Sequence, residues 1–322
     1  MPHVAASIAW PTLPMVRQGR APSPSPTPPS VRVATLIGGS SVLVWSTAAS
    51  FAVLGSALPP LLFLAGAFAS GFLAFVVARL VRGQSPLEML AVPLPVLCLL
   101  VLGFLGHNGL YVTALRYAPA AQVNLISYLW PLLMVVLLGL AGIARPTALQ
   151  VFGSLLGFAG LAWFVSPGVA DGGPGGGLFG YLLAFLAACC FALYSALRSK
   201  LSAGPPDAAG AACGVAALIA ASLHLLFGAP VALDALHQVE PLAILAMVLI
   251  GVGPMGLANL LWDYGVRFGD GRLLSAFAYL TPVLSTLLLV TLGLAVLTSH
   301  VLIGGGLILS GIAVSALGVR KS

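Results

Sequence analysis

The chain has 322 residues, of which 60% are hydrophobic and only 6% are charged, and it carries thirteen bases against seven acids. Soluble domains carry about 25% charged residues, so this composition excludes a soluble globular protein. We therefore expect an integral membrane protein. Helices are the default way to cross lipid, because each helix satisfies its own backbone hydrogen bonds. The uninterrupted apolar runs lack the alternation typical of β-barrel strands.

The first 31 residues differ from the rest of the chain. They are rich in proline and serine and contain no long apolar core followed by a cleavage site. This composition predicts a disordered cytoplasmic tail over residues 1–31 rather than a cleaved signal peptide. A gene start assigned too far upstream would produce the same pattern, so the true start codon stays open.

Beyond this tail the chain is divided into long apolar runs. About 20 apolar residues are needed to cross the hydrocarbon core of a bilayer as a helix. Ten runs come close to or exceed this length, and charged or turn-forming residues separate them. They cover residues 33–54, 59–81, 89–115, 119–140, 147–166, 178–197, 208–227, 241–266, 273–293 and 299–317. The sequence therefore predicts an all-α integral membrane protein with ten transmembrane helices.

The positions of the basic residues predict the orientation. Lysine and arginine accumulate in cytoplasmic loops. An N-terminus inside the cell places twelve of the thirteen bases in the cytoplasm and leaves only Arg116 outside, whereas Asp171, Asp234 and Glu240 fall on the outer side. We predict a multi-pass protein of the bacterial inner membrane with both termini cytoplasmic. The net charge of +6 is explained by topology and does not indicate nucleic acid as a partner.

The second half of the chain repeats the first. A shift of 151 positions aligns runs 3 to 5 with runs 8 to 10 without a gap. It superposes Asn108 on Asn259, Arg116 on Arg267, Tyr128 on Tyr279, Pro131 on Pro282, Gly153 on Gly304 and Gly160 on Gly311. Each unit has five helices, an odd number, so the units must have opposite orientations. We predict two inverted five-helix repeats, over residues 32–170 and 178–322, joined by a Gly-rich periplasmic linker over residues 171–177. Inverted repeats are typical of transporters, whose substrate site lies between the repeats near the midplane.

Polar and aromatic side chains concentrate on six of the ten runs. Such polar groups are costly in lipid and usually face a cavity or a partner helix. Their spacing places His107, Asn108 and Tyr111 on one helix face. Asn259 and Trp262 repeat the Asn108–Tyr111 spacing in the second half. The substrate-binding candidates are Trp45, His107, Asn108, Tyr111, Asn124, Tyr128, Tyr194, Asn259, Trp262 and Tyr279.

Two prolines and one histidine add detail to this candidate site. Pro131 and Pro282 predict helix kinks, because a helical proline cannot bond the carbonyl four residues back. The freed carbonyls of Ser127 and Ala278 would either be acceptors at the membrane centre or bond a neighbouring hydroxyl in a packing kink, and the sequence leaves both open. For His107 a structural or substrate-contacting role is favoured over proton coupling.

The cysteines and glycines of the chain do not indicate a catalytic, metal or redox site. The four cysteines lie inside apolar runs, where packing is favoured over a metal or redox site. Glycines spaced along runs 5 and 10 indicate close helix packing, in a scaffold or a dimer face. The sequence contains no HExxH pattern, no paired intramembrane acids and no phosphate-binding loop. We therefore predict no catalytic residue, no metal and no cofactor.

Three segments resemble a known family. They are ATLIGGSSVLVWSTAASF at residues 34–51, SYLWPLL at 127–133 and YLTPVLS at 279–285. They are similar to the EamA-like drug/metabolite transporter superfamily, and most of all to its bacterial aromatic amino acid exporters. The resemblance implies that helices 1, 3, 4, 6, 8 and 9 surround a central cavity while helices 5 and 10 lie outside. It carries seven of the candidates onto the cavity wall, namely Trp45, Asn108, Tyr128, Tyr194, Asn259, Trp262 and Tyr279.

Residues and resemblance together predict an inner-membrane exporter of aromatic amino acids and related small molecules that works by alternating access. Aromatic walls suit an aromatic side chain, aromatic faces and freed carbonyls suit an ammonium, and amides with His107 suit a carboxylate. Efflux of cationic aromatic drugs or of another small metabolite is the alternative within transport. An intramembrane enzyme or an open channel fits less well, because the sequence shows no nucleophile pattern and aromatic residues fill its centre. The expected partners are a small-molecule substrate and the lipid bilayer, and both a monomer and a homodimer are compatible.

Overall fold

The computed structural model describes residues 30–48, 50–51, 58–171, 177–201, 203–227, 239–293 and 296–319. Within these ranges the regular structure is entirely helical. The α-helices are α1 (Val31–Trp45), α3 (Pro60–Val81), α4 (Leu94–Val101), α5 (His107–Ala114), α6 (Ala120–Ser127), α7 (Trp130–Leu140), α8 (Ala148–Asp171), α9 (Leu178–Leu197), α10 (Ala208–Phe227), α12 (Pro241–Ile250), α13 (Ala258–Phe268), α14 (Gly271–Ala278), α15 (Leu280–Thr291) and α16 (Ser299–Val319). A short 3₁₀-helix η1 (Pro86–Leu90) and two π-helical turns, η2 (Leu102–Gly106) and η3 (Gly251–Leu257), complete the set.

These helices fit a membrane in length and composition. In the described part of the chain, nine helices are long and apolar enough to cross a bilayer, and several of them consist of two or three consecutive elements, such as α12, η3 and α13. The first predicted span is described as the 15-residue helix α1. Its predicted outer end, at residue 49 and residues 52–54, lies outside the described residues, as do most of the predicted tail and of the linker. The all-α membrane fold is thus confirmed, with nine spans described in full length.

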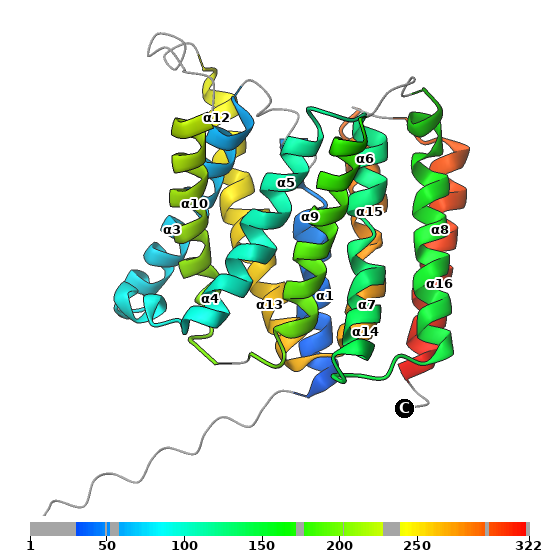
Figure 1. Ribbon diagram of the computed structural model, residues 1–322, viewed down its shortest axis with the longest axis horizontal. Helices are drawn as coiled ribbons and strands as arrows, with labels where there is room; N and C mark the ends of the chain where they lie inside the picture. The colour runs from blue at the N-terminus through cyan, green and yellow to red at the C-terminus, as the bar shows by residue number, and fades with distance from the viewer. Residues whose placement is uncertain are drawn as a thin grey trace, which may run out of the picture.

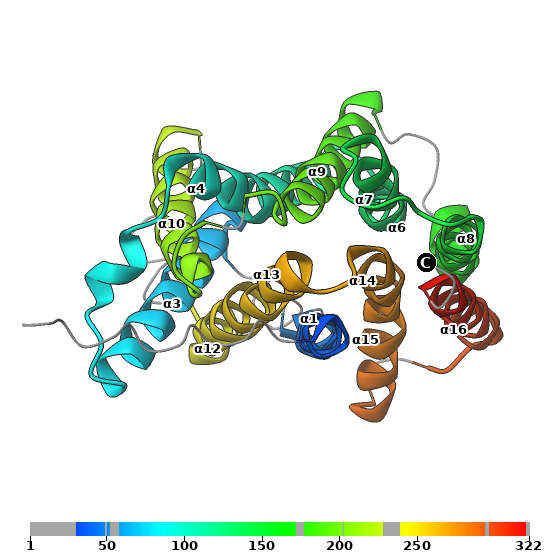
Figure 2. The same cartoon turned by 90° about the horizontal axis from the view of Figure 1, so that it is seen from below.

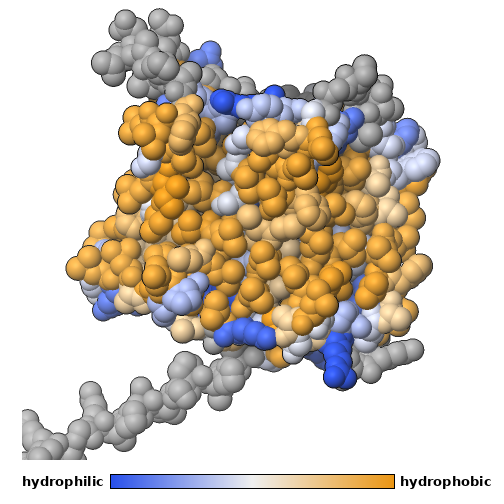
Figure 3. All heavy atoms as spheres, in the orientation of Figure 1, coloured by the Kyte–Doolittle hydropathy of each residue, from blue (hydrophilic) through white to orange (hydrophobic). Residues whose placement is uncertain are grey.

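The outer surface agrees with lipid as the surrounding solvent. Leu36, Leu73, Leu225 and Leu302 each have more than half of their surface exposed on the outside of the bundle. Figure 3 shows a broad band of hydrophobic side chains across the face in view, with hydrophilic residues gathered toward its two ends. Exposed leucines in such numbers would be unfavourable in water, but they lose nothing in hydrocarbon.

The helices form two facing groups with a pair at each end. Figure 2 shows α13, α1, α14 and α15 on one side and α9, α7 and α6 on the other. Within these groups α1 packs on α13, and α5 packs on α9. At one end of the molecule α8 packs along α16, and at the other end α3 packs along α10 (Figures 1 and 2). We call the end where α1 begins and α16 finishes the lower end, as it lies in Figure 1, and the opposite end the upper end.

Glycines bring the backbones of α8 and α16 into contact. A Cβ atom added to Gly153 would lie 2.4 Å from the carbonyl oxygen of Gly311, and one added to Gly160 would lie 2.8 Å from that of Gly304. The pairing of the earlier glycine of one helix with the later glycine of the other shows that the two helices run antiparallel. Of the two roles predicted for this glycine spacing, the structure shows packing within the chain.

Local geometry recurs at the predicted spacing. The turn η2 maps onto residues 253–257 of η3 when shifted by 151 positions. The side-chain amide Nδ2 of Asn108 donates to the carbonyl of Phe104 at 2.8 Å, and that of Asn259 donates to the carbonyl of Met255 at 3.0 Å. Phe104 and Met255 are themselves 151 residues apart.

The helices that contain the two prolines are also interrupted at matching places. Helix α6 ends at Ser127 and α7 begins at Trp130, directly before Pro131. Helix α14 ends at Ala278 and α15 begins at Leu280, two residues before Pro282. A proline lacks the N–H that would continue the hydrogen-bond ladder, so each helix divides into an upper and a lower segment.

Candidate binding cavity

A cavity of about 470 Å³ lies between the two groups of helices. This is within the range of about 300–1,000 Å³ found for small-molecule sites. Its wall comes from both groups and includes Trp45 of α1, Tyr128 beside the α6–α7 break and Asn259 of α13. No aspartate, glutamate, lysine or arginine is among the residues that line it in the described chain. The cavity is therefore aromatic and apolar, with a few neutral polar groups.

Seven of the ten candidate residues line this cavity. They are Trp45, His107, Asn108, Tyr111, Asn124, Tyr128 and Asn259. Trp45 is fixed by a hydrogen bond from its indole Nε1 to the carbonyl oxygen of Pro254 at 3.1 Å. The ring of His107 stacks on that of Tyr111 with 6.3 Å between their centroids. The structure brings these seven side chains together, and their contact with a substrate stays a prediction.

The other three candidates, Tyr194, Trp262 and Tyr279, are fully buried and do not line the cavity. The Tyr194 hydroxyl donates to Asp263 Oδ1 at 3.2 Å. Trp262 Nε1 donates to Ser195 Oγ at 3.0 Å. Tyr279 packs in a hydrophobic cluster with residues of α8 and α16. In this conformation these three side chains serve packing and hydrogen bonding.

Several lining residues were not among the candidates. Trp130 and Phe191 contribute aromatic faces, and Thr281, Ser285 and Thr286 contribute hydroxyls from α15. Trp130 lies in the SYLWPLL segment, so its motif was visible, but only the tyrosine of that motif was taken as a candidate. Thr281 belongs to the Tyr-Leu-Thr-Pro motif, and Ser285 lies four residues further on, on the same helix face.

Aromatic rings close the cavity toward the lower end. The ring centroids of Trp130 and Phe191 are 4.7 Å apart, those of Trp130 and Trp262 are 5.4 Å apart, and those of Trp45 and Trp262 are 5.2 Å apart. Toward the upper end, by contrast, the lining continues to Leu289, near the end of α15. The cavity thus reaches toward the upper end and is floored by aromatic side chains below.

A buried ion pair lies below this aromatic floor. Arg198 Nε is 2.7 Å from Asp263 Oδ1, and the two side chains are 0% and 1% exposed. Arg267 also approaches Asp263, with 3.7 Å between Nη1 and Oδ2. The pair joins α9 to α13, which belong to opposite groups. Sequence reasoning counted Arg198 and Arg267 only as cytoplasmic charges, because the partners of a charge across a bundle are not visible in the pattern of one helix.

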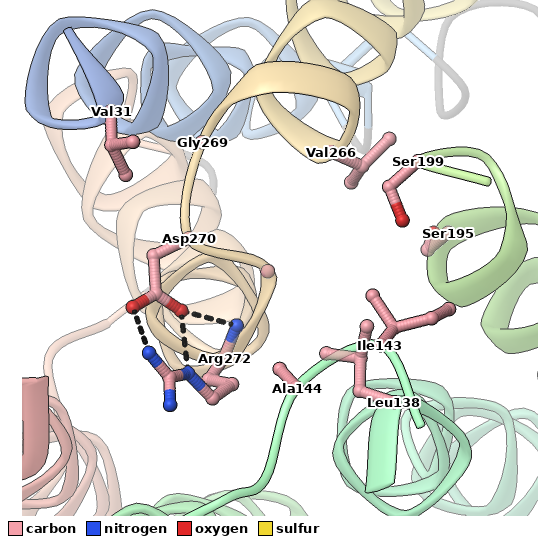
Figure 4. Close-up of a pocket in the computed structure, with 11 residues that line it drawn as sticks. Val31, Leu138, Ile143, Ala144, Ser195, Ser199, Val266, Gly269, Asp270 and Arg272 are labelled. Carbon is pink, nitrogen blue, oxygen red and sulfur yellow. Dashed lines mark hydrogen bonds and ion pairs between the residues drawn. The ribbon is translucent and has the colours of Figure 1, made fainter. Parts of the chain in front are cut away.

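A second, smaller cavity of about 190 Å³ lies at the lower end (Figure 4). Figure 4 shows Asp270 and Arg272 facing one another on one side, with Ser195 and Ser199 on the other. Arg272 Nη2 is 2.9 Å from Asp270 Oδ2. Along α9, Phe191 lines the central cavity and Ser195 lines the lower one, one turn further on. The lower cavity therefore lies one turn of α9 away from the central one, on the far side of the aromatic floor.

No metal centre is apparent in the described ranges, where no three histidine, cysteine, aspartate or glutamate side chains come close enough to hold an ion. Cys213 is buried, and Cys98, Cys189 and Cys190 are partly or fully exposed on the bundle surface; all four are free.

A bundle of membrane-spanning helices around a central ligand-sized cavity, closed toward one end, is the architecture of a membrane transporter. The model of the EamA-like transporter family matches residues 33–166 and again residues 178–317. The chain belongs to this family.

The chain is also similar to a curated relative and to a solved structure over most of its length. It is 36% identical over 293 residues to the aromatic amino acid exporter YddG of Ancylobacter novellus, and the alignment covers 89% of this chain and 98% of the relative. A solved crystal structure superposes with a TM-score of 0.82 at 35% identity, covering 91% of this chain and 100% of the other.

The resemblance to the superfamily implied that helices 5 and 10 lie outside the cavity. The pair α8 and α16 does lie at the edge of the bundle (Figure 2). However, Leu161, Phe164 and Val165 of α8 line the cavity, and so do Phe63 and Leu64 of α3. Helix α8 is therefore both part of the packed edge and part of the cavity wall.

Proposed function

We propose that this protein exports aromatic amino acids and related small molecules across the bacterial inner membrane by alternating access. The observation that carries this proposal is the 36% identity to an aromatic amino acid exporter over 98% of its length. The cavity supports it, because Trp45, Trp130 and Phe191 offer aromatic faces to an aromatic side chain. Ring pairs of this kind contribute about 0.5–1.5 kcal/mol beyond burial.

The topology we propose has ten transmembrane helices, with α1 as part of the first, and cytoplasmic termini. The lower end is then the cytoplasmic end. Among the described residues, every lysine and arginine except Arg116 then lies on the cytoplasmic side, as expected for cytoplasmic loops. The central cavity then reaches toward the outside, while the aromatic floor and the Arg198–Asp263 pair close it toward the cytoplasm.

We further propose that the two halves are inverted repeats, and that they exchange roles during transport. The double match of the family model and the recurring geometry of Asn108 and Asn259 support this proposal. Equivalent residues differ in exposure: Tyr111 and Tyr128 line the cavity, whereas their counterparts Trp262 and Tyr279 are buried. Such asymmetry is expected if one side is open, so Trp262 and Tyr279 should line the path when the cytoplasmic side opens.

One chain contains the whole proposed path, so we propose that a single subunit is the transport unit. The glycine contacts between α8 and α16 lie within the chain and do not require a dimer.

A cellular assay tests the substrate class. Cells that express the protein should survive higher concentrations of a toxic aromatic analogue, 4-fluorophenylalanine, than cells with an empty vector. Trp45→Ala should weaken this protection, because Trp45 lines the cavity. The matched control is Trp163→Ala, since Trp163 is exposed on α8 and does not line the cavity. Equal sensitivity of all four strains would refute export of this class.

A further inference from the structure

The hydrogen bond of His107 fixes which ring nitrogen is available to a ligand. Its Nδ1 lies 3.0 Å from the carbonyl oxygen of Ala187 on α9. A carbonyl oxygen can only accept, so Nδ1 carries the hydrogen and donates. Among the described residues no carboxylate lines the cavity to stabilise an imidazolium, so the neutral ring is the favoured form. In that form Nε2 is an acceptor, which a ligand can reach because His107 lines the cavity.

The two asparagines of the cavity wall are also oriented by hydrogen bonds that leave an acceptor free. The Nδ2 groups of Asn108 and Asn259 donate to carbonyls of their own helices, at 2.8 and 3.0 Å. These bonds orient each side chain by its amide nitrogen and leave its Oδ1 as an acceptor. Asn108 belongs to α5 and Asn259 to α13, so acceptors are present in both groups of helices.

The rest of the lining favours positive over negative charge. Aromatic faces attract cations through their quadrupole, and Trp45, Trp130 and Phe191 supply three of them. No lysine or arginine lines the cavity in the described chain, so a carboxylate would meet only neutral donors, such as the Tyr111 hydroxyl and the Asn124 amide. The aromatic faces therefore favour an ammonium, and no basic side chain offsets this preference for a carboxylate.

We infer that the cavity recognises its ligand through the ammonium group, with His107 Nε2, Asn108 Oδ1 and Asn259 Oδ1 as acceptors, and that the ligand's carboxylate is dispensable. The ligand class then includes arylalkylamines as well as aromatic amino acids. This inference rests on the proposed function for the aromatic part of the ligand. It also reverses one expectation from the sequence, since His107 accepts from an ammonium and does not donate to a carboxylate.

Three ligands with the same phenylethyl skeleton separate the two charged groups. Phenylalanine carries both groups, 2-phenylethylamine carries only the ammonium, and 3-phenylpropionate carries only the carboxylate. The measurement is equilibrium binding of labelled 2-phenylethylamine to the purified full-length protein, together with competition by the other two ligands. The amine should bind and phenylalanine should displace it. The affinity of 3-phenylpropionate should be lower than that of the amine by about tenfold or more, as expected when a bond to a charged group is lost.

A pair of variants assigns the effect to the acceptors. Asn108→Leu should lower the affinities for 2-phenylethylamine and phenylalanine by about tenfold. The affinity for 3-phenylpropionate should stay unchanged. Thr113→Val is the matched control, because Thr113 lies on the same helix and also bonds a carbonyl four residues back, at 2.7 Å, but does not line the cavity. If Asn108→Leu does not elute as a folded protein, Asn259→Leu tests the same acceptor chemistry from α13.

The outcomes distinguish this inference from the proposed function. Competition by 3-phenylpropionate at least as strong as that by the amine would overturn the inference, even if phenylalanine is transported. An equal loss of all three ligands in Asn108→Leu would also overturn it. If the amine binds as expected but phenylalanine does not cross the membrane, the inference holds and the proposed export of amino acids fails.

Discussion

Replacing Asp263 with asparagine should open the lower end of the protein, which we propose is the cytoplasmic end. Asp263 and Arg198 join α9 to α13 below the aromatic floor, with 2.7 Å between Nε and Oδ1 and with both side chains buried. Removing one partner of a buried ion pair costs about 3–5 kcal/mol, because the other charge stays uncompensated. When α9 and α13 separate, Arg198 gains access to water, and this cost disappears. The substitution therefore favours the cytoplasm-open conformation by at least about a hundredfold.

Thiol labelling measures this shift without a substrate. Ala48 lines the cavity, so the thiol introduced by Ala48→Cys should react with a membrane-impermeant maleimide added from outside. Asp263→Asn should lower this rate by about tenfold or more, since the rate follows the population of the outward-facing state. Glu88→Gln is the control, because the Glu88 side chain that pairs with Arg79 is 67% exposed and such pairs contribute little. The background requires alanine at the native thiols, Cys98, Cys189, Cys190 and Cys213.

An unchanged external labelling rate in folded Asp263→Asn would refute this role for the ion pair. An equal decrease in Glu88→Gln would also refute it, because loss of any nearby charge would then suffice.

Three further outcomes follow from the packing, the cavity and the charges. Gly160→Leu should lower the free energy of unfolding by at least about 1–3 kcal/mol, because a Cβ there would lie 2.8 Å from a backbone oxygen of α16. Gly306→Leu is the control, because no atom lies within 4 Å of a Cβ placed there. In detergent its melting temperature should stay near that of the unmodified protein, while that of Gly160→Leu should fall. Trp45→Ala should reduce phenylalanine flux by about tenfold, because the binding energy of one aromatic ring pair corresponds to up to about that factor in affinity. Trp163→Ala should leave the flux unchanged. Two reporters can be fused after Ser322, one that is active only in the cytoplasm and one that is active only in the periplasm. We expect activity from the cytoplasmic reporter, and activity from the periplasmic reporter alone would contradict the topology.

The helical fold was predictable because lipid imposes a simple rule on the sequence. Apolar length alone located nine spans, which the structure describes as helices of membrane-crossing length, and the first predicted run contains the shorter helix α1. The prolines at 131 and 282 also marked the places where the structure divides two spans in two. These features depend on local sequence, so no knowledge of neighbouring helices was required.

The site was less predictable because it depends on helix rotation and on conformation. The π-helical turns η2 and η3 widen the helix directly before Asn108 and Asn259, so a constant 100° step per residue does not hold across them. Trp262 and Tyr279 were chosen by symmetry with cavity residues, but the cavity reaches toward one end only, and their positions are buried in this conformation. The Arg198–Asp263 pair joins helices far apart in sequence, and nothing in either helix alone indicates it.

The most direct test of transport is phenylalanine flux into proteoliposomes that contain the purified protein, with and without an imposed pH difference. We predict saturable flux down the phenylalanine gradient, above that of protein-free liposomes, without any pH difference. The reason is that no carboxylate of the part of the chain that the structure describes lines the central cavity to relay protons. His107→Gln, which keeps a donor and an acceptor, should retain substantial flux. Flux no greater than in protein-free liposomes, or flux that strictly requires a pH difference and is lost in His107→Gln, would contradict downhill export by alternating access.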